Sequence, residues 1–137
     1  MAVSTQYKPN KNEEYMNPRQ LEYFRKKLLA WREELEVESK KMLKDMLDDI
    51  NHQEIGDEAD HAARESEHAL EMRTHDRYRK LLPKIDAALQ RIEDGIYGFC
   101  EETGEPIGLA RLEARPIATL SVEAQERREL RQRQTGL

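Results

Sequence analysis

The chain has 137 residues, of which 37% are hydrophobic and 37% are charged, and its formal net charge is −5 at pH 7. This acidic balance excludes a protein whose main affinity is for nucleic acid phosphates, because that affinity requires a basic face. No segment has the apolar length of a membrane span, the start lacks an export-signal pattern, and the single cysteine is typical of a reducing compartment, so we expect a cytoplasmic protein with a small core.

Residues 1–17 mix polar residues and a proline with isolated apolar positions, and we expect them to pack on the body of the protein through Tyr7, Tyr15 and Met16. A helix is expected to begin directly afterwards. Asn17 is a preferred N-cap residue, and Pro18 falls in the first turn, where proline costs least.

Two long helical patterns, at residues 18–51 and 59–94, predict an antiparallel coiled-coil hairpin. The first has apolar residues at alternating spacings of three and four until Glu38 interrupts the series, which then resumes in a shifted register. In the second, Pro83 predicts a kink or a short break. The expected seam positions of the first pattern are Leu21, Phe24, Leu28, Trp31 and Leu35, then Met42 or Leu43, Met46 or Leu47, and Ile50.

The connection at residues 54–63 is expected to be the tip of the hairpin, within a coiled-coil domain spanning residues 18–94. Gly56 is a common helix terminator, Asp57 is a good N-cap, and Asp60 falls where an acid favours the positive end of the helix dipole. Capping alone would explain both acids. A functional contact of their carboxylates is the alternative, and the two readings do not exclude each other.

Three histidines, His61, His68 and His75, follow one another at intervals of seven residues near one helix face. One helix cannot bring residues two turns apart onto a single ion, and the i, i+4 spacing of helical zinc ligands is missing. We therefore interpret this series as a solvated face and not as a metal site.

Residues 95–137 change character and are expected to form a small globular body followed by a C-terminal helix. Glycines and a proline between residues 95 and 108 indicate tight turns with short strands, and residues 109–116 indicate a turn or a short helix. Ser121 is placed to cap the last helix, whose first turn carries Glu123.

Two residue pairs in this body, Cys100-x2-Thr103 and Ser121-x2-Ala124, have the spacing of a four-cysteine zinc ribbon in which three ligands are replaced. Together with three further motifs, this spacing resembles the DksA family of RNA polymerase-binding transcription factors over nearly the whole chain. The further motifs are Glu13-Glu14-Tyr15-Met16-Asn17, Asp57-x-x-Asp60-x-Ala62 and Arg111-Leu112-Glu113-Ala114-Arg115-Pro116.

The chain departs from a zinc ribbon at the metal ligands themselves. Thr103 and Ser121 offer only neutral hydroxyls and Ala124 offers no donor, so the lone thiolate of Cys100 cannot hold zinc as a structural site does. We expect a degenerate, metal-free body without any cofactor. Cys100 is then a buried small residue, with a reactive thiol as the alternative.

The resemblance implies a function at RNA polymerase. Members of the family insert the tip of their coiled coil into the secondary channel of the enzyme, and their tip residues match Asp57, Asp60 and Ala62, with His61 where familiar relatives have arginine. It thus implies a regulator that destabilises open promoter complexes, notably at ribosomal RNA promoters, without binding DNA.

The resemblance also implies an effector, the alarmone ppGpp of the stringent response, which family members bind in a cleft shared with the polymerase. Lys84 and Arg115 suit a pyrophosphate group. Gln125 is a lysine in familiar relatives, so one phosphate contact is missing. The positions that match the cleft are Leu81, Lys84, Arg115 and Gln125.

Two other functions stay open from the residues alone: a coiled-coil adaptor or chaperone-like interaction protein, and a transcript-cleavage factor acting in the secondary channel. An enzyme is not expected, because the sequence has no Gly-rich phosphate loop, nucleophile motif or viable ligand set. We expect a monomer whose partners are RNA polymerase and ppGpp, with no membrane partner.

Overall fold

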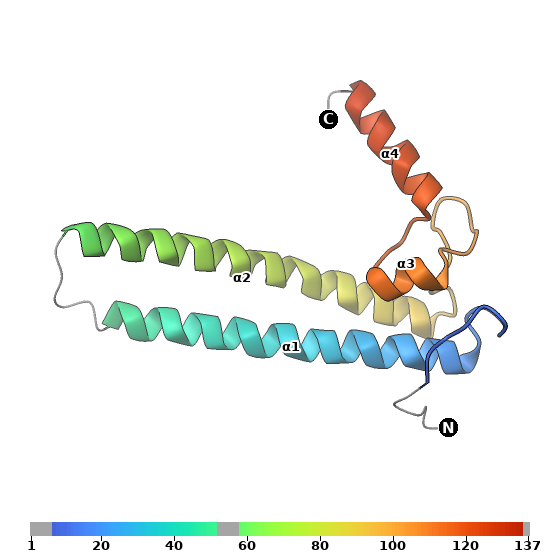
Figure 1. Cartoon of the computed structure of the whole chain (residues 1–137), viewed down its shortest axis with the longest axis horizontal. Helices are drawn as coiled ribbons and strands as arrows, with labels where there is room; N and C mark the ends of the chain where they lie inside the picture. The colour runs from blue at the N-terminus through green and yellow to red at the C-terminus, as the bar shows by residue number, and fades with distance from the viewer. Residues whose placement is uncertain (1–6, 52–57, 136–137) are drawn as a thin grey trace. The chain divides into compact units, whose positions relative to one another are not determined.

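The computed structural model describes residues 7–51 and 58–135. Figure 1 shows the four helices formed by these residues: α1 (Pro18–Asn51), α2 (Glu58–Glu93), α3 (Leu109–Ala114) and α4 (Val122–Thr135). The chain divides into two compact units, unit 1 comprising Met1–Leu29 and Asp86–Leu137, and unit 2 comprising Ala30–Ile85. None of the described helices is long and apolar enough to cross a membrane.

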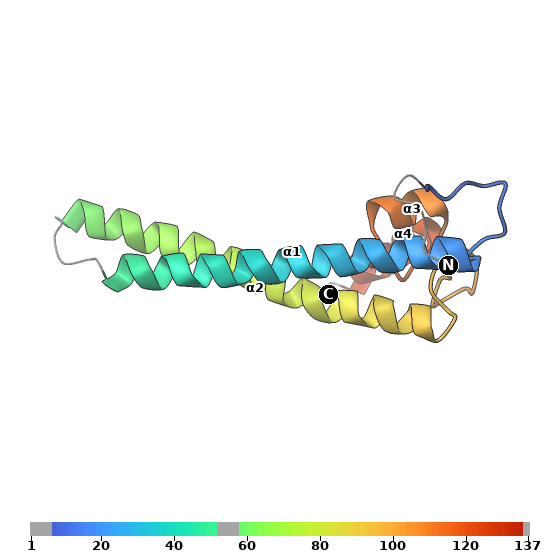
Figure 2. The same ribbon diagram turned by 90° about the horizontal axis from the view of Figure 1, so that it is seen from below.

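Unit 2 is a helical hairpin made of the C-terminal part of α1 and most of α2. The two segments lie side by side in both Figure 1 and Figure 2. Their antiparallel register is marked by His68, whose Nε2 donates a hydrogen bond of 2.9 Å to a carboxylate oxygen of Asp49. The prediction of a mainly helical protein with a long antiparallel hairpin is therefore confirmed.

The seam of unit 2 follows the shifted register that the sequence predicts as far as Met46, but the prediction is wrong at Ile50, which is 48% exposed. Glu38 is exposed, while the neighbouring Ser39 is 9% exposed and takes the seam position. Met46 is buried, whereas Leu47 is 59% exposed. Few large apolar side chains are buried in unit 2. The hydrophobic stabilisation of this hairpin therefore comes from a small buried area.

Of the kink or short break predicted at Pro83, the break does not form. Helix α2 runs without interruption from Glu58 to Glu93 with Pro83 inside it. Proline removes one amide donor and crowds one preceding carbonyl, and a long helix accommodates this on its solvent side by slight lengthening of hydrogen bonds. Pro83 is exposed, and the nearby side chains of Ile85 and Ala88 are completely buried, so packing of the opposite face holds the helix together.

Most of the largest fully buried side chains among the described residues lie in unit 1. Its core joins the first turns of α1 to the residues after α2 through a tilted ring contact between Phe24 and Tyr97, whose centroids are 5.7 Å apart. The hydroxyl of Tyr97 donates a buried hydrogen bond of 2.8 Å to the carbonyl oxygen of Pro116. The buried apolar residues of unit 1 are Phe24, Leu28, Ala88, Tyr97, Cys100, Ile107, Leu112, Leu120 and Ala124.

Two helix caps form where the sequence predicts them. The side-chain oxygen of Asn17 accepts hydrogen bonds from the amides of Arg19 and Gln20, at 2.9 and 3.0 Å. The hydroxyl oxygen of Ser121 accepts one from the amide of Ala124 at 3.2 Å. Both caps satisfy donors that have no partner within the helix.

The short strands predicted between residues 95 and 108 are absent from the described residues. An isolated antiparallel bridge between Phe99 and Pro106 stands in their place. The loop is closed by backbone hydrogen bonds from Cys100 to Glu105, at 2.7 Å, and from Ile107 to Gly98, at 2.8 Å. The two sides of this loop pair at a single bridge, between Phe99 and Pro106. A regular strand needs at least three paired residues, so the loop is too short to form one.

Candidate functional site

The predicted tip residues lie at the beginning of α2, except for Asp57, which lies outside the described residues. Asp60 is in the first turn of α2, where its charge favours the positive end of the helix dipole. Asp60 and Ala62 are exposed, and His61 is half-buried. The roles of these four residues in binding a partner stay a prediction.

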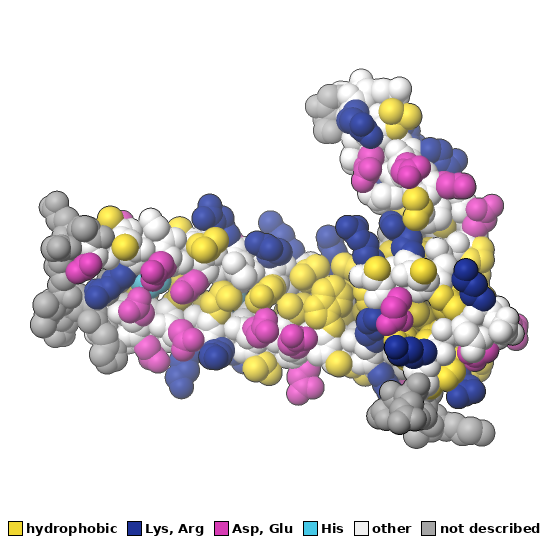
Figure 3. Space-filling model, in the orientation of Figure 1, with side chains coloured by type: hydrophobic (Ala, Val, Ile, Leu, Met, Phe, Trp, Pro, Cys, Tyr) yellow, Lys and Arg dark blue, Asp and Glu magenta, His cyan; other side chains and the backbone are white. Residues whose placement is uncertain are grey.

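Charged side chains of both signs lie on the surface of unit 2 (Figure 3). On the face shown in Figure 3, Lys and Arg side chains are interspersed with Asp and Glu along the helices of unit 2. Such a mixed surface gives no broad basic patch on this face that would attract nucleic acid.

The four degenerate ligand positions come together in unit 1. Cys100 is 3% exposed. Burial raises the pKa of its thiol, but hydrogen bonds from the hydroxyl of Thr103 and from the amides of Ser121, Thr103 and Glu102 outweigh burial and lower the pKa to about 6. The sulfur is thus held as an anion by hydrogen-bond donors that converge on it from two segments of the chain.

This donor set does not fit a structural zinc ion. Such an ion needs four strong ligands, and Cys100 supplies the single thiolate here. Ala124 is completely buried and has no side-chain donor, and the Ser121 oxygen caps α4. In the described part of the chain, no group of three or more His, Cys, Asp or Glu side chains could hold a metal ion.

The residues predicted for an alarmone cleft are divided between the two units. Leu81 and Lys84 lie on α2 in unit 2, where Lys84 is exposed. Arg115 follows α3 and Gln125 lies on α4, both in unit 1. Gln125 donates a hydrogen bond of 3.0 Å to Glu129. That the four residues form one cleft with a partner stays a prediction.

Sequence reasoning missed a cluster of contacts beside Arg115. The hydroxyl of Tyr23 and the ammonium of Lys27 both donate to one carboxylate oxygen of Glu113, at 2.6 and 2.7 Å. Burial and this hydrogen bond raise the pKa of Tyr23 to about 12. Partial burial raises the pKa of Glu113, but hydrogen bonds from Lys27 and Tyr23 outweigh it and hold the pKa below its ordinary value.

The only signal for this cluster was the spacing of Tyr23 and Lys27, which are four residues apart and so share one face of α1. Their partner Glu113 is separated from Lys27 by 86 residues in sequence. No local pattern indicates a contact across that distance.

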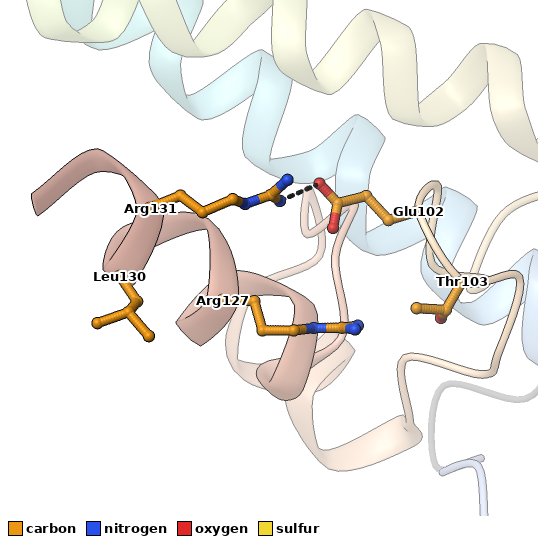
Figure 4. Close-up of a pocket in the computed structure, with 5 residues that line it drawn as sticks. All are labelled: Glu102, Thr103, Arg127, Leu130 and Arg131. Carbon is orange, nitrogen blue, oxygen red and sulfur yellow. Dashed lines mark hydrogen bonds and ion pairs between the residues drawn. The ribbon is translucent and has the colours of Figure 1, made fainter. Parts of the chain in front are cut away.

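A pocket of about 400 Å³ lies between the loop that follows Cys100 and α4. Figure 4 shows that the side chain of Arg127 extends across it toward Thr103. Arg131 donates to a carboxylate oxygen of Glu102 at 3.4 Å and closes one side. No pattern in the sequence indicates this pocket. Its lining residues are Glu102, Thr103, Arg127, Leu130 and Arg131.

Comparisons with known proteins agree with this architecture. A sequence model described as "DnaK suppressor protein DksA, N-terminal domain" matches residues 20–92. A second, described as "Prokaryotic dksA/traR C4-type zinc finger", matches residues 95–130. The second match therefore rests on the remainder of the body, since three of the four cysteines of that type of finger are replaced in this chain.

Relatives match over nearly the whole chain. The RNA polymerase-binding transcription factor DksA of Caulobacter vibrioides is 58% identical over 134 residues, which cover 97% of this chain and 92% of the relative. The protein of the same name from Escherichia coli K12 is 42% identical over 128 residues, covering 93% and 83%. The solved structure of transcription factor DksA2 from Pseudomonas aeruginosa has a TM-score of 0.76 and 46% identity, covering 87% of this chain and 90% of that one. With a helical hairpin and a body that both match, the chain belongs to the DksA family.

Proposed function

We propose that this protein binds RNA polymerase and regulates transcription initiation from the secondary channel of the enzyme, without contacting DNA. The observation that carries the proposal is the 58% identity, over 97% of the chain, to a relative named as an RNA polymerase-binding transcription factor. The formal net charge of −5 supports action through the polymerase and not through DNA.

The start of α2 is the working end in this proposal. Asp60 is exposed in the first turn of the helix, and Asp57 precedes that helix by one residue in sequence. In a narrow passage of low dielectric constant, a carboxylate interacts strongly with cations and with the mobile elements that handle substrate. Ala62 is exposed and small, so it leaves room for the hairpin in such a passage.

The regulatory result of this contact is a weaker open promoter complex, notably at ribosomal RNA promoters. The effector is ppGpp, bound at the polymerase, and the residues of this chain proposed to contact it are Leu81, Lys84, Arg115 and Gln125. Lys84 and Arg115 are both exposed, and their cationic groups suit a pyrophosphate. Gln125 supplies no charge, so this site has one cation fewer than a site with lysine at that position.

The test separates binding from action. Asp57→Asn and Asp60→Asn remove charge at nearly constant shape, so we expect affinity for RNA polymerase to change little while inhibition of a ribosomal RNA promoter in a reconstituted assay is lost. Asp76→Asn, at an exposed position further along α2, is the matched control and should retain both properties. Full inhibition by the Asp57→Asn and Asp60→Asn variants would contradict the role of the tip.

A further inference from the structure

Arg115 stands out in unit 1 because its backbone is fixed while its side chain is exposed. Its amide donates a hydrogen bond of 2.7 Å to the carbonyl oxygen of Arg111, and its own carbonyl oxygen accepts one of 3.0 Å from the amide of Ala118. Both backbone groups of the residue are therefore satisfied within the protein. The side chain itself is exposed to solvent.

The carbonyl groups on both sides of Arg115 are anchored as well. The carbonyl oxygen of Glu113 accepts a hydrogen bond of 2.9 Å from the ammonium of Lys27, and that of Pro116 accepts the buried bond from Tyr97. Glu113 is near the C-terminus of α3, where carbonyl groups lack partners within the helix and favour a nearby cation. Lys27 supplies both a hydrogen-bond donor for the carbonyl oxygen of Glu113 and a positive charge at this end of the helix.

Helix α3 depends on such outside contacts because it is short. It has 6 residues, and its N-cap residue, Gly108, makes no side-chain capping hydrogen bond. A helix of this length is not stable by itself in water. Besides the buried Leu112, the contacts that fix its last turn are those of Glu113 with Tyr23 and Lys27 and the hydrogen bond of 3.0 Å that Nε of Arg111 donates to the carbonyl oxygen of Leu120.

From these contacts we infer that Tyr23, Lys27 and Glu113 are positioning residues that hold Arg115 in place to receive the pyrophosphate of ppGpp. The inference rests on the proposed function and adds to it the reason why the backbone of an arginine at the end of a short helix is held in place. An arginine whose backbone is already fixed loses less freedom when its guanidinium binds a phosphate in the two-pronged geometry. Loss of the carboxylate of Glu113 frees the last turn of α3 and lowers the affinity for ppGpp without touching the tip.

The first arm of the experiment uses the free protein and needs no polymerase. Amide hydrogen exchange at Arg115 and Ala118 reports on the hydrogen bonds that fix Arg115. Because the ion pair is only partly buried, we expect exchange at both amides to accelerate by about threefold in Glu113→Gln and in Lys27→Met. Lys27→Arg keeps a cation and should restore most of the protection. Glu14→Gln, at an exposed position of unit 1, removes the same charge elsewhere and should leave exchange at both amides unchanged.

The second arm measures the ppGpp concentration that gives half of the additional inhibition of a ribosomal RNA promoter. Glu113→Gln should raise this concentration by about threefold and leave inhibition without ppGpp unchanged. In an Arg115→Ala background, Glu113→Gln should have no further effect on it, because a positioning residue acts through the group that it positions.

The outcomes separate the inference from the proposed function. A wild-type chain that never inhibits the promoter contradicts the proposed function, and one that inhibits but ignores ppGpp contradicts this inference and the alarmone cleft together. A normal response of Glu113→Gln to ppGpp, with a wild-type chain that responds, overturns the positioning role alone. Equal effects of Glu113→Gln with and without Arg115 would also overturn it.

Discussion

The hydroxyl of Tyr15 donates a hydrogen bond of 2.6 Å to the carbonyl oxygen of Gly98, a residue 83 positions away in sequence. The same hydroxyl oxygen accepts a hydrogen bond of 3.0 Å from the amide of Gly108. One phenol thus ties the segment before α1 to both sides of the loop that follows α2.

Tyr15→Phe is expected to destabilise unit 1 by about 1–2 kcal/mol. The substitution keeps the ring that packs edge-on against Phe99 but leaves a carbonyl and an amide of the loop without their partner. Urea unfolding followed by circular dichroism measures the change. Tyr78→Phe is the matched control, a half-buried tyrosine on α2, and should differ from wild type by much less. Equal stability of the two variants would contradict this account of Tyr15.

Gly98 tolerates no side chain, for two reasons that can be separated. Its φ is +91°, and an added Cβ would lie 2.8 Å from Cγ of Met16. Gly104 has a φ of +75° with nothing within 4 Å of an added Cβ, so it shares the first reason but not the second. We expect Gly104→Ala to cost about 1 kcal/mol, the penalty for a left-handed conformation, and Gly98→Ala to cost clearly more. Thermal unfolding of the two variants checks this order, and a smaller loss for Gly98→Ala would refute it.

The thiol of Cys100 predicts a pH dependence of stability. Its pKa is about 6 in the folded chain against an ordinary value of 9.0, so between these values the unfolded chain binds more protons. Stability from this group is therefore fully present above pH 9.0, falls as the pH is lowered, and is lost below about pH 6.

Cys100→Ser isolates this effect, because the serine hydroxyl does not ionise in that range. The stability difference between wild type and Cys100→Ser should grow from pH 6 to pH 9, and the ultraviolet absorbance of the wild-type thiolate should titrate with a midpoint near 6. A difference that is flat with pH, or a midpoint near 9, would show that the sulfur is not held as an anion.

The solvated face predicted for the three histidines is wrong at His75, which lies in the seam of unit 2 and weakens it. It is 7% exposed, and its Nδ1 has no hydrogen-bond partner in the described structure. Replacing a buried polar group that lacks a partner with an apolar one of similar size is stabilising, so His75→Leu should raise stability by about 1 kcal/mol. His68→Leu, which removes the contact with Asp49, should not stabilise. Calorimetry of the full chain distinguishes the two variants, and a lower melting temperature for His75→Leu would contradict the prediction.

The sequence predicted those features that are determined by neighbours along the chain. The caps at Asn17 and Ser121 were predictable because a side chain and an amide two or three residues away are sufficient to form them. The shift of the seam after Leu35 was predictable for the same reason, since helical spacing determines which side chains share a face. The four ligand positions converge because a ribbon-like spacing persists even where the ligands are replaced.

Features that depend on contacts distant in sequence were not predictable. Pro83 suggested a break because the rule for proline is local, yet the burial of Ile85 and Ala88 maintains the helix. The contact of Lys27 with Glu113 has no signal in the sequence, because each residue alone reads as an exposed charge on a helix. At the tip, Asp60 lies in the first turn of α2, as its predicted role at the helix dipole requires. Its role as a working group at a partner stays a prediction.

The most direct test of the central claim is site-specific crosslinking from the start of α2. A photo-crosslinking amino acid in place of the exposed Ala62 reports which part of RNA polymerase lies against it. The proposed function predicts crosslinks to segments that line the secondary channel, and loss of these crosslinks when excess unmodified protein is added. Crosslinks confined to the outer surface of the enzyme, or none at saturating protein, would contradict it.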